Sequence, residues 1–227
     1  MLNYEIDPSV LQPFVPTGTK LDQWSGKTFV SVVGFMFLNT RVLGLPIPFH
    51  TNFEEVNLRF YVRRITLDGP RRGVVFIKEI VPRAAIAWTA RTFYNENYVS
   101  LPMRHKISGD AEGESIFCYE WNFNRCPNWL SATICGQASE IEEGSAEEYI
   151  TEHYWGYARQ RDGGTVEYQV EHPRWRVWSA KSYDLRCDFE RLYGRAFAPF
   201  LLQPPASAFV ADGSAVTVRK GRRLILE

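Results

Sequence analysis

The sequence lacks most of the features that would assign it to a well-marked class of protein. Its 227 residues include only four cysteines and no CxxC pair. It has no GxSxG elbow, no GxGxxG turn and no P-loop, so the common signatures of serine hydrolases and nucleotide-binding proteins are missing. The four histidines have no HxH or i, i+4 partner, so we expect no metal site, and nothing indicates a cofactor.

An excess of charge of either sign is also missing, because 26 basic residues balance 26 acidic ones. A net charge of zero gives no long-range attraction for nucleic acid or for an anionic membrane surface. No hydrophobic run approaches the ~18 residues that a membrane span needs, and the first residues carry acids and prolines instead of the apolar stretch of a signal peptide. We therefore predict a cytoplasmic protein with free thiols and no nucleic-acid or membrane partner. The oligomeric state stays open.

Strand signals dominate what is present. No repeat or low-complexity linker divides the chain, so we expect one domain over residues 1–227. Runs of β-branched and aromatic residues between turn signals predict strands at 27–37, 52–65, 73–80, 103–108, 115–123, 165–172 and 175–179, and a terminal hairpin over 216–226 that turns at Lys220-Gly221. Helices are expected at 83–95, at 145–157 behind a capping box from Ser145 to Glu148, and at 184–193 before Gly194. The predicted fold class is α+β, with a curved or closed antiparallel sheet and a few flanking helices.

The predicted strand from Asn52 to Arg64 has two different faces. Because side chains alternate along a strand, one face carries only apolar residues: Val56, Leu58, Phe60 and Val62. The other carries Phe53, Glu55, Asn57, Arg59, Tyr61 and Arg63. This second set, called the polar row below, mixes both signs of charge with an amide and aromatic rings. It is typical of a pocket wall, although a solvated surface face or an internal ion pair could look the same.

Arg59 is the centre of the pocket hypothesis. A buried arginine needs a partner because an isolated interior charge costs several kcal/mol. Glu55, four residues earlier on the same face of the strand, is the expected one. A guanidinium and a carboxylate with Asn57 between them could anchor a small polar ligand, since the guanidinium suits a carboxylate or phosphate. We expect Glu55 to act as the acid or base, Arg59 and Asn57 to bind the ligand, and Tyr61 to be an auxiliary donor.

Further candidates lie on the neighbouring segments. Asn39 and Arg41 end the first long strand, and a proline-rich loop then leads to His50, a possible general acid or base. Arg91 shares a helix face with Trp88 and is either a pocket cation or a stem packed on the core. Lys78 alternates with Phe76, so it is either an amine nucleophile or a lysine that protects an edge strand.

Three segments of the chain resemble a known family: NTRVLGLPIPFHTNFEEVNLRFYV, TARTFYNENYVSLPM, and HPRWRVW with FVADGSAVTV. They are similar to the YqjF-like family of uncharacterised proteins, which is grouped by fold with acetoacetate decarboxylase. The resemblance runs over nearly the whole chain. It implies a β-rich barrel with flanking helices and a central polar pocket.

The resemblance also limits the chemistry. In the decarboxylases a strand glutamate is followed by an arginine and then by a Pro-Lys-Lys motif whose first lysine forms an imine with the keto acid. Glu55 and Arg91 match the first two elements, but Met103 stands in the place of that lysine. We therefore expect a protein that binds a small carboxylate- or carbonyl-containing molecule without an imine. The alternative is a lyase or decarboxylase that uses Glu55 or another lysine such as Lys78.

Overall fold

The computed structural model describes residues 1–42, 45–46, 51–83, 97–109 and 113–225. Within these ranges strands are far more extensive than helices, as the sequence predicts. The helices are α1 (Pro8–Leu11), the 3-10 helix η1 (Gln12–Phe14), α3 (Ala146–Thr151), α4 (Phe189–Tyr193) and α5 (Ala198–Leu201). None of the described helices is long and apolar enough to cross a membrane.

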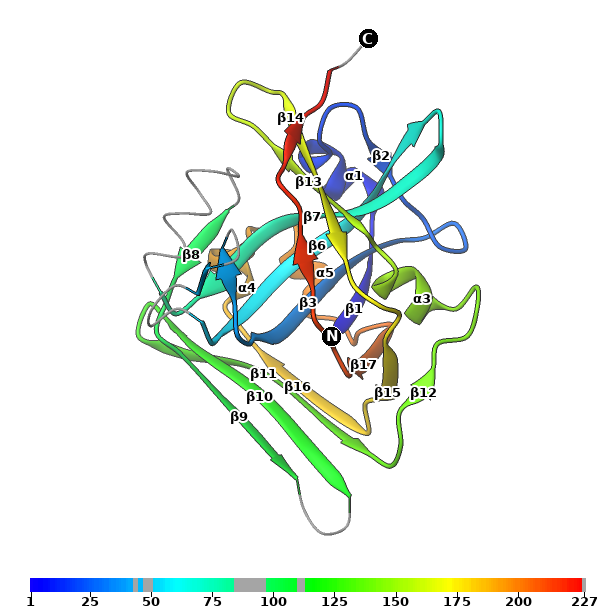
Figure 1. The fold of residues 1–227 in the computed structure, drawn as a ribbon. Coiled ribbons are helices and arrows are strands. Elements are labelled where there is room, and N and C mark those ends of the chain that lie inside the picture. The colour runs from blue at the N-terminus through cyan, green and yellow to red at the C-terminus, as the bar shows by residue number, and fades with distance from the viewer. Residues whose placement is uncertain (43–44, 47–50, 84–96, 110–112, 226–227) are drawn as a thin grey trace.

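A large sheet forms the centre of the molecule (Figure 1). Its main path, in spatial order, is β12 (Ser139–Glu140), β15 (Arg176–Ser179), β17 (Ser207–Ala211), β1 (Leu2–Ile6), β3 (Thr28–Phe37), β6 (Phe53–Thr66), β7 (Gly69–Val81), β13 (Trp155–Arg159), β14 (Thr165–Glu171) and β18 (Thr217–Val218). Three short strands join it from the side: β2 (Lys20–Leu21), β8 (Tyr98–Ser100) and β19 (Arg222–Arg223).

A second sheet of four strands packs across one face of the first. Its order is β16 (Ser182–Arg186), β11 (Cys126–Cys135), β10 (Glu114–Phe123) and β9 (Met103–Gly109), and a separate pair joins β4 (Arg41–Val42) to β5 (Leu45–Pro46). Tyr119, Trp121 and Leu130 of the second sheet share a hydrophobic core with the apolar face of β6. The core is therefore enclosed between the two sheets, with α4 and α5 beside it.

The expected antiparallel barrel is corrected in two respects. Among the described strands, β7 pairs in parallel with both β13 and β8, so the large sheet is mixed. The order of its strands runs from β12 to β18 without returning, so the sheet is not closed. Sequence periodicity cannot distinguish these cases, because alternation along a strand is the same in either direction of pairing.

Several predicted elements are shorter than expected, or different. Ser145 caps α3 through the amide of Glu148, as predicted, but the helix ends at Thr151 and residues 155–159 form β13. The predicted helix 184–193 is helical only from Phe189, because residues 182–186 form β16 beside β11. Most of the predicted helix 83–95 lies outside the described residues.

The predicted C-terminal hairpin is wrong. β18 and β19 both pair with β14 and not with each other. Their registers differ by one residue, so the Lys220-Gly221 pair marks an irregularity along one extended segment. A glycine inside a strand signal indicates a bulge as readily as a turn.

Gly156 of β13 provides a test of how tightly this part of the sheet is packed. A Cβ atom at Gly156 would lie 2.1–2.4 Å from three atoms of the Tyr168 side chain, which is itself buried. We expect Gly156→Ala to lower the free energy of unfolding by about 1–3 kcal/mol, as overpacked cores do. Urea denaturation measures the change. Gly109→Ala is the matched control, since its added Cβ would meet the Ser115 hydroxyl at 3.2 Å and the Glu114 carbonyl oxygen at 3.4 Å. A loss of stability as large as that of Gly156→Ala would contradict the prediction of tight packing at Gly156.

Candidate functional site

The polar row lies inside the molecule and not on its surface. Strand β6 is central, with β3 and β7 paired along its two edges, and side chains on both of its faces are buried. Glu55, Asn57 and Tyr61 are each only 1% exposed, whereas Arg63 at the end of the row is exposed. The alternative of a solvated surface face is therefore excluded for the row from Phe53 to Tyr61.

Glu55 is held by neutral groups. Asn57 donates from Nδ2 to Glu55 Oε1 (2.9 Å), and the Tyr98 hydroxyl of β8 donates to Oε2 (3.3 Å). Burial raises the pKa of Glu55 to about 7, against the opposing effects of the hydrogen bonds from Asn57 and Tyr98 and of the Arg59 charge. Near neutral pH the carboxyl group can therefore both give and accept a proton.

A second carboxyl group, on β7, belongs to the same site. Glu79 is the cross-strand neighbour of Asn57 and the parallel neighbour of Tyr98, and it is 2% exposed. The Oδ1 atom of Asn57 is buried without a hydrogen-bond partner among the described residues. Glu55, Asn57, Glu79 and Tyr98, called the Glu55 cluster below, thus combine two buried acids with an unused acceptor.

Arg59 does not form the ion pair that the sequence predicts. Of the ion pairs between described residues, none joins Arg59 to Glu55. Arg59 instead donates from Nη2 to the carbonyl oxygen of Ile150 at the end of α3 (3.2 Å), and its Nε is buried without a partner in the described part of the chain. Within the described ranges, the guanidinium therefore keeps a free donor and has no carboxylate in contact.

His153 lies beside Arg59 and was not predicted. Its ring packs 4.7 Å from that of Tyr61, it is 6% exposed, and neither ring nitrogen has a hydrogen-bond partner among the described residues. Burial, followed by the charges of Arg72 and Arg59, lowers its pKa well below the usual 6.5, so the imidazole is neutral at pH 7. No sequence signal identifies it, because α3 and β6 are far apart in the chain.

The other predicted site residues lie in different parts of the molecule or outside its described part. Tyr61 contacts the hydroxyl of Ser31 (2.5 Å), which in turn donates to Asn3. Asn39 and Arg41 are exposed at the end of β3 and in β4. His50 and Arg91 lie outside the described residues. The described residues contain no group of three His, Cys, Asp or Glu side chains placed to hold a metal ion.

Lys78 does not share the face of the Glu55 cluster. The register between β6 and β7 shifts after Leu58, so Ile77 is an extra residue, Lys78 pairs with Leu58, and Phe76 pairs with Arg59. Paired residues point to the same side of a sheet, which places Lys78 on the apolar face of β6. There its amino group donates to the carbonyl oxygen of Leu192 in α4.

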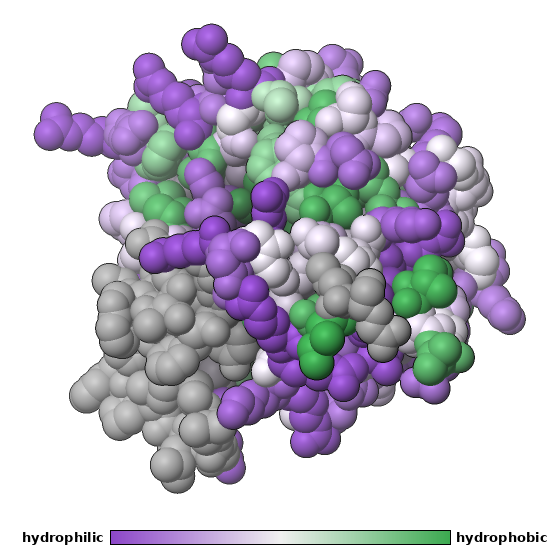
Figure 2. All heavy atoms as spheres, turned by 90° about the horizontal axis from the view of Figure 1, so that it is seen from above, coloured by the Kyte–Doolittle hydropathy of each residue, from purple (hydrophilic) through white to green (hydrophobic). Residues whose placement is uncertain are grey.

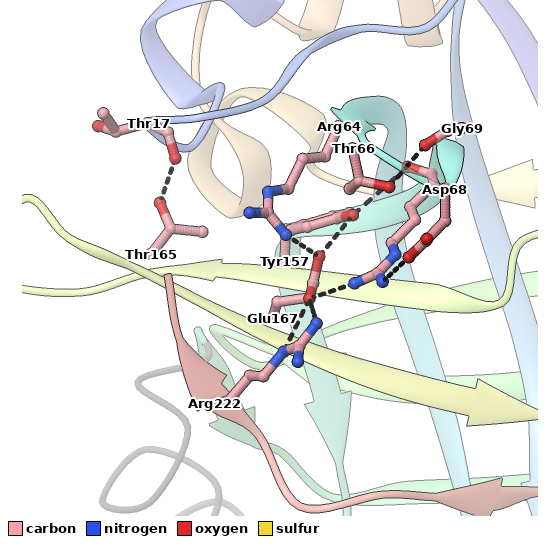
Figure 3. Close-up of polar contacts among 10 residues, drawn as sticks. Thr17, Arg64, Thr66, Asp68, Gly69, Tyr157, Thr165, Glu167 and Arg222 are labelled. Atoms are coloured by element: carbon pink, nitrogen blue, oxygen red, sulfur yellow. Dashed lines mark hydrogen bonds and ion pairs between the residues drawn. The ribbon is translucent and has the colours of Figure 1, made fainter. Parts of the chain in front are cut away.

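Glu167 on β14 shows how the same fold treats a buried acid that stabilises it. Its carboxylate is fully buried and lies 2.9–3.1 Å from Arg64, Arg71 and Arg222 and 3.2 Å from the Tyr157 hydroxyl. Figure 3 shows Arg64, Arg222 and Tyr157 converging on it. Burial alone would raise the pKa of Glu167, but hydrogen bonds from Arg222 and Arg64 and the charges of Arg64 and Arg71 outweigh it and lower the pKa. Glu55 is equally inaccessible, and within the described part of the chain it has no such cation in contact.

A cavity of about 260 Å³ lies at the other end of the same face of β6. Its lining includes Asp22, Trp24, Arg63 and Arg72. The Asp22 carboxylate accepts a hydrogen bond from Arg72 Nε (2.7 Å) and lies 4.0 Å from Arg63 Nε. Glu55 is not among the described residues that line it. The cavity and the Glu55 cluster are therefore separate features of one sheet face.

A family model for DUF2071, described as an uncharacterised conserved protein, matches residues 1–215. The chain belongs to this family. It is also 28% identical over 184 residues to the uncharacterised protein YqjF of Bacillus subtilis, covering 79% of this chain and 72% of that protein. The resemblance to YqjF-like proteins that the sequence indicates is thus confirmed.

Solved structures establish the fold of this DUF2071 member. It is similar to acetoacetate decarboxylase from Legionella pneumophila (TM-score 0.61, 13% identity, 99% of this chain and 83% of that one). It is also similar to the enduracididine biosynthesis enzyme MppR complexed with pyruvate (TM-score 0.64, 13% identity, 98% and 86%). An acetoacetate decarboxylase-like enzyme from Sphingomonas wittichii gives a TM-score of 0.60 at 14% identity, over 99% and 89%. At these identities the likeness concerns the fold alone.

Proposed function

We propose that this DUF2071 protein binds a small keto acid or a related carboxylate in a polar pocket built on the Glu55 cluster and Arg59. The observation that carries the proposal is that Glu55 is buried and, among the described residues, has no cation in contact. A carboxyl group that only stabilises the fold would be paired, as Glu167 is. Strongly shifted carboxyl groups of this kind occur preferentially at functional sites.

The arrangement of charge along β6 suggests how such a ligand would lie. Arg59, with its free Nε, is the anchor for a carboxylate, since a guanidinium presents donors in the geometry that a carboxylate accepts. Glu55, on the same face of β6 and about 13 Å along the strand, would face the carbonyl end. Neutral His153 beside Arg59 would add a hydrogen bond. His50 and Arg91 remain proposed contributors, as do Asn39 and Arg41 at the end of β3.

The positions of the lysines favour binding without an imine. Lys27 and Lys181 pair with Glu5 and Glu114 at the surface, and Lys78 lies on the opposite face of β6. The remaining lysines, Lys20, Lys106 and Lys220, are exposed. No lysine of the chain is therefore placed to attack a ligand held by Glu55. We further propose that the protein acts in the cytoplasm as a single domain.

Pyruvate and acetoacetate are the probes, because one structural neighbour is complexed with pyruvate and others are named for acetoacetate. Isothermal titration calorimetry should show saturable binding of at least one of the two at pH 6.5. Arg59→Met should weaken it at least tenfold, by removing the charge-assisted hydrogen bonds that hold the carboxylate. Glu171→Gln on the surface is the matched control. Absence of saturable binding by the native protein, or native affinity in a folded Arg59→Met variant, would contradict the proposal.

The same sample distinguishes a catalytic role from simple binding. A carboxyl group with a pKa near 7 is suited to removing a proton next to a carbonyl. If the protein is an enzyme that uses Glu55, the methyl protons of pyruvate will exchange with D₂O in its presence, and Glu55→Gln will abolish the exchange. Borohydride should trap no adduct, and an adduct on Lys78 would revive the imine alternative.

A further inference from the structure

The C-terminal segment, defined as residues 216–225, covers the outer edge of β14. In Figure 1 the red strand runs alongside the yellow β14, on the side away from β13. Backbone hydrogen bonds of 2.8 Å run from Arg219 to the Gln169 carbonyl and from Leu224 to the Thr165 carbonyl. Without this segment, β14 would expose an unpaired edge, which can pair with any suitable strand.

Three arginine–acid pairs hold the segment in place. Arg219 makes two hydrogen bonds to Glu171 (2.9 and 2.8 Å), Arg222 contacts Glu167 (2.9 Å) and Arg223 contacts Asp162 (2.7 Å). The arginine side chains are 57–62% exposed. The pairs made by Arg219 and Arg223 therefore lie in solvent, where such pairs are weak and screened by salt, whereas Arg222 reaches the buried carboxylate of Glu167. Figure 2, viewed from above, shows hydrophilic side chains spread over this end of the molecule.

Hydrophobic contacts add little to the attachment. Leu224 is the one buried large side chain of the segment, whereas Val216, Val218 and Ile225 are 48%, 54% and 86% exposed. Departure of the segment also leaves no bare buried charge, because Glu167 keeps Arg64 and Arg71, each at 3.1 Å. The energetic obstacle to release is therefore small.

The edge nevertheless fits this segment in shape as well as in charge. Arg223 lies flat against Gly164, where an added Cβ would come within 2.3 Å of the guanidinium. Gly221 likewise passes over Val166, which would lie 2.7 Å from a Cβ at that position. Gly164 on the β14 side and Gly221 in the segment thus allow the close approach that brings the arginines to their acidic partners. An arbitrary basic peptide would lack this match.

We propose that the β14 edge is a strand-docking site for the segment 216–225, which exchanges between its own chain and a second copy. The exposed link over residues 212–215, with Gly213 at a positive φ of 71°, allows the segment to leave without disturbing β17. Release by one copy opens the edge to the segment of another. The result would be a strand-exchanged pair whose population depends on ionic strength.

A fluorescent peptide of residues 215–225 can represent the segment of the second copy. The recipient is the full chain with Arg219→Glu, Arg222→Glu and Arg223→Glu, in which repulsion from Asp162, Glu167 and Glu171 should release the chain's own segment. A milder variant, Arg219→Gln with Arg223→Gln, serves if the triple variant does not fold. Hydrogen exchange of the amides of Glu167, Gln169 and Glu171 reports the release, because these amides face the segment and alternate with those that face β13.

Fluorescence anisotropy should show saturable binding to the released variant, weaker by about tenfold between 0.05 and 0.5 M NaCl because salt screens the pairs. A scrambled peptide of the same composition, and one with Gly221→Ala, should each bind at least tenfold more weakly. Three outcomes overturn the proposal: amides of Glu167, Gln169 and Glu171 that stay protected in the variant, no binding once they exchange, or equal binding of the scrambled peptide. The last would leave only nonspecific charge attraction.

Discussion

Glu167→Gln is expected to lower the free energy of unfolding by about 3–5 kcal/mol, the loss typical of removing one partner from a buried ion pair. The substitution keeps the size of the side chain but leaves the largely buried Arg64 without its counter-charge, and leaves Arg71 only the exposed carboxylate of Asp68, at 3.5 Å. It also weakens the link from Arg222 across to the C-terminal segment. Urea denaturation at pH 7 measures the change.

The control for this prediction is Glu171, four residues further along the same strand. Glu171 also pairs with one arginine, but both side chains are substantially exposed, so Glu171→Gln should cost less than about 1 kcal/mol. The pKa of Glu167 is lowered in the folded state, so its contribution is present above the unfolded value near 4.5 and is lost as the pH falls through the folded value. Equal losses for the two variants would show that the buried network is not a stabilising centre.

Glu55→Gln is expected to raise the free energy of unfolding at pH 8, whereas Glu167→Gln lowers it. Folding raises the pKa of Glu55 from 4.5 to about 7, so the folded protein binds the proton more tightly than the unfolded chain does. Between those two values stability falls as the pH rises, by a total on the order of 3 kcal/mol. The glutamine variant, which cannot ionise, should lack this fall and be more stable than the native protein at pH 8.

Unfolding of both proteins at pH 5 and pH 8 tests this directly. At pH 5 the native Glu55 is protonated and the two proteins should have similar stability, whereas at pH 8 they should differ. A gain in stability combined with a loss of ligand binding is the pattern expected of a residue kept for function at the expense of the fold. If Glu55→Gln destabilises the protein at pH 8 by as much as Glu167→Gln does, Glu55 is a structural residue.

The sequence indicates the central strands well and the site only in part. Alternation of polar and apolar residues along β6 identifies which side chains lie on each face, because successive side chains of a strand point to opposite sides of the sheet. The capping box correctly places the start of α3 but cannot show that the helix ends at Thr151, because the strand pairing of β13 decides that. Tertiary contacts override local propensity in the same way at β16.

The errors in the site have one physical origin. The side on which Lys78 points depends on a single inserted residue, Ile77, and an insertion is invisible to a pattern that counts in steps of two. Arg59 was assigned to the nearest acid along the strand, but the carbonyl of Ile150 comes from a helix 91 residues away. His153 and Tyr98 reach the row in the same way, through contacts that only the folded chain creates.

The two-faced character of β6 also bears on how the chain finds its fold. A slip of β6 by one residue relative to β3 would exchange its faces and put Glu55, Asn57 and Arg59 against the hydrophobic core between the sheets. Alternative pairings are therefore heavily penalised, and the polar row selects a single alignment of the longest strand in the molecule. Replacing the row with apolar residues would leave a strand whose two faces look alike, and with it a choice of registers that the native sequence denies.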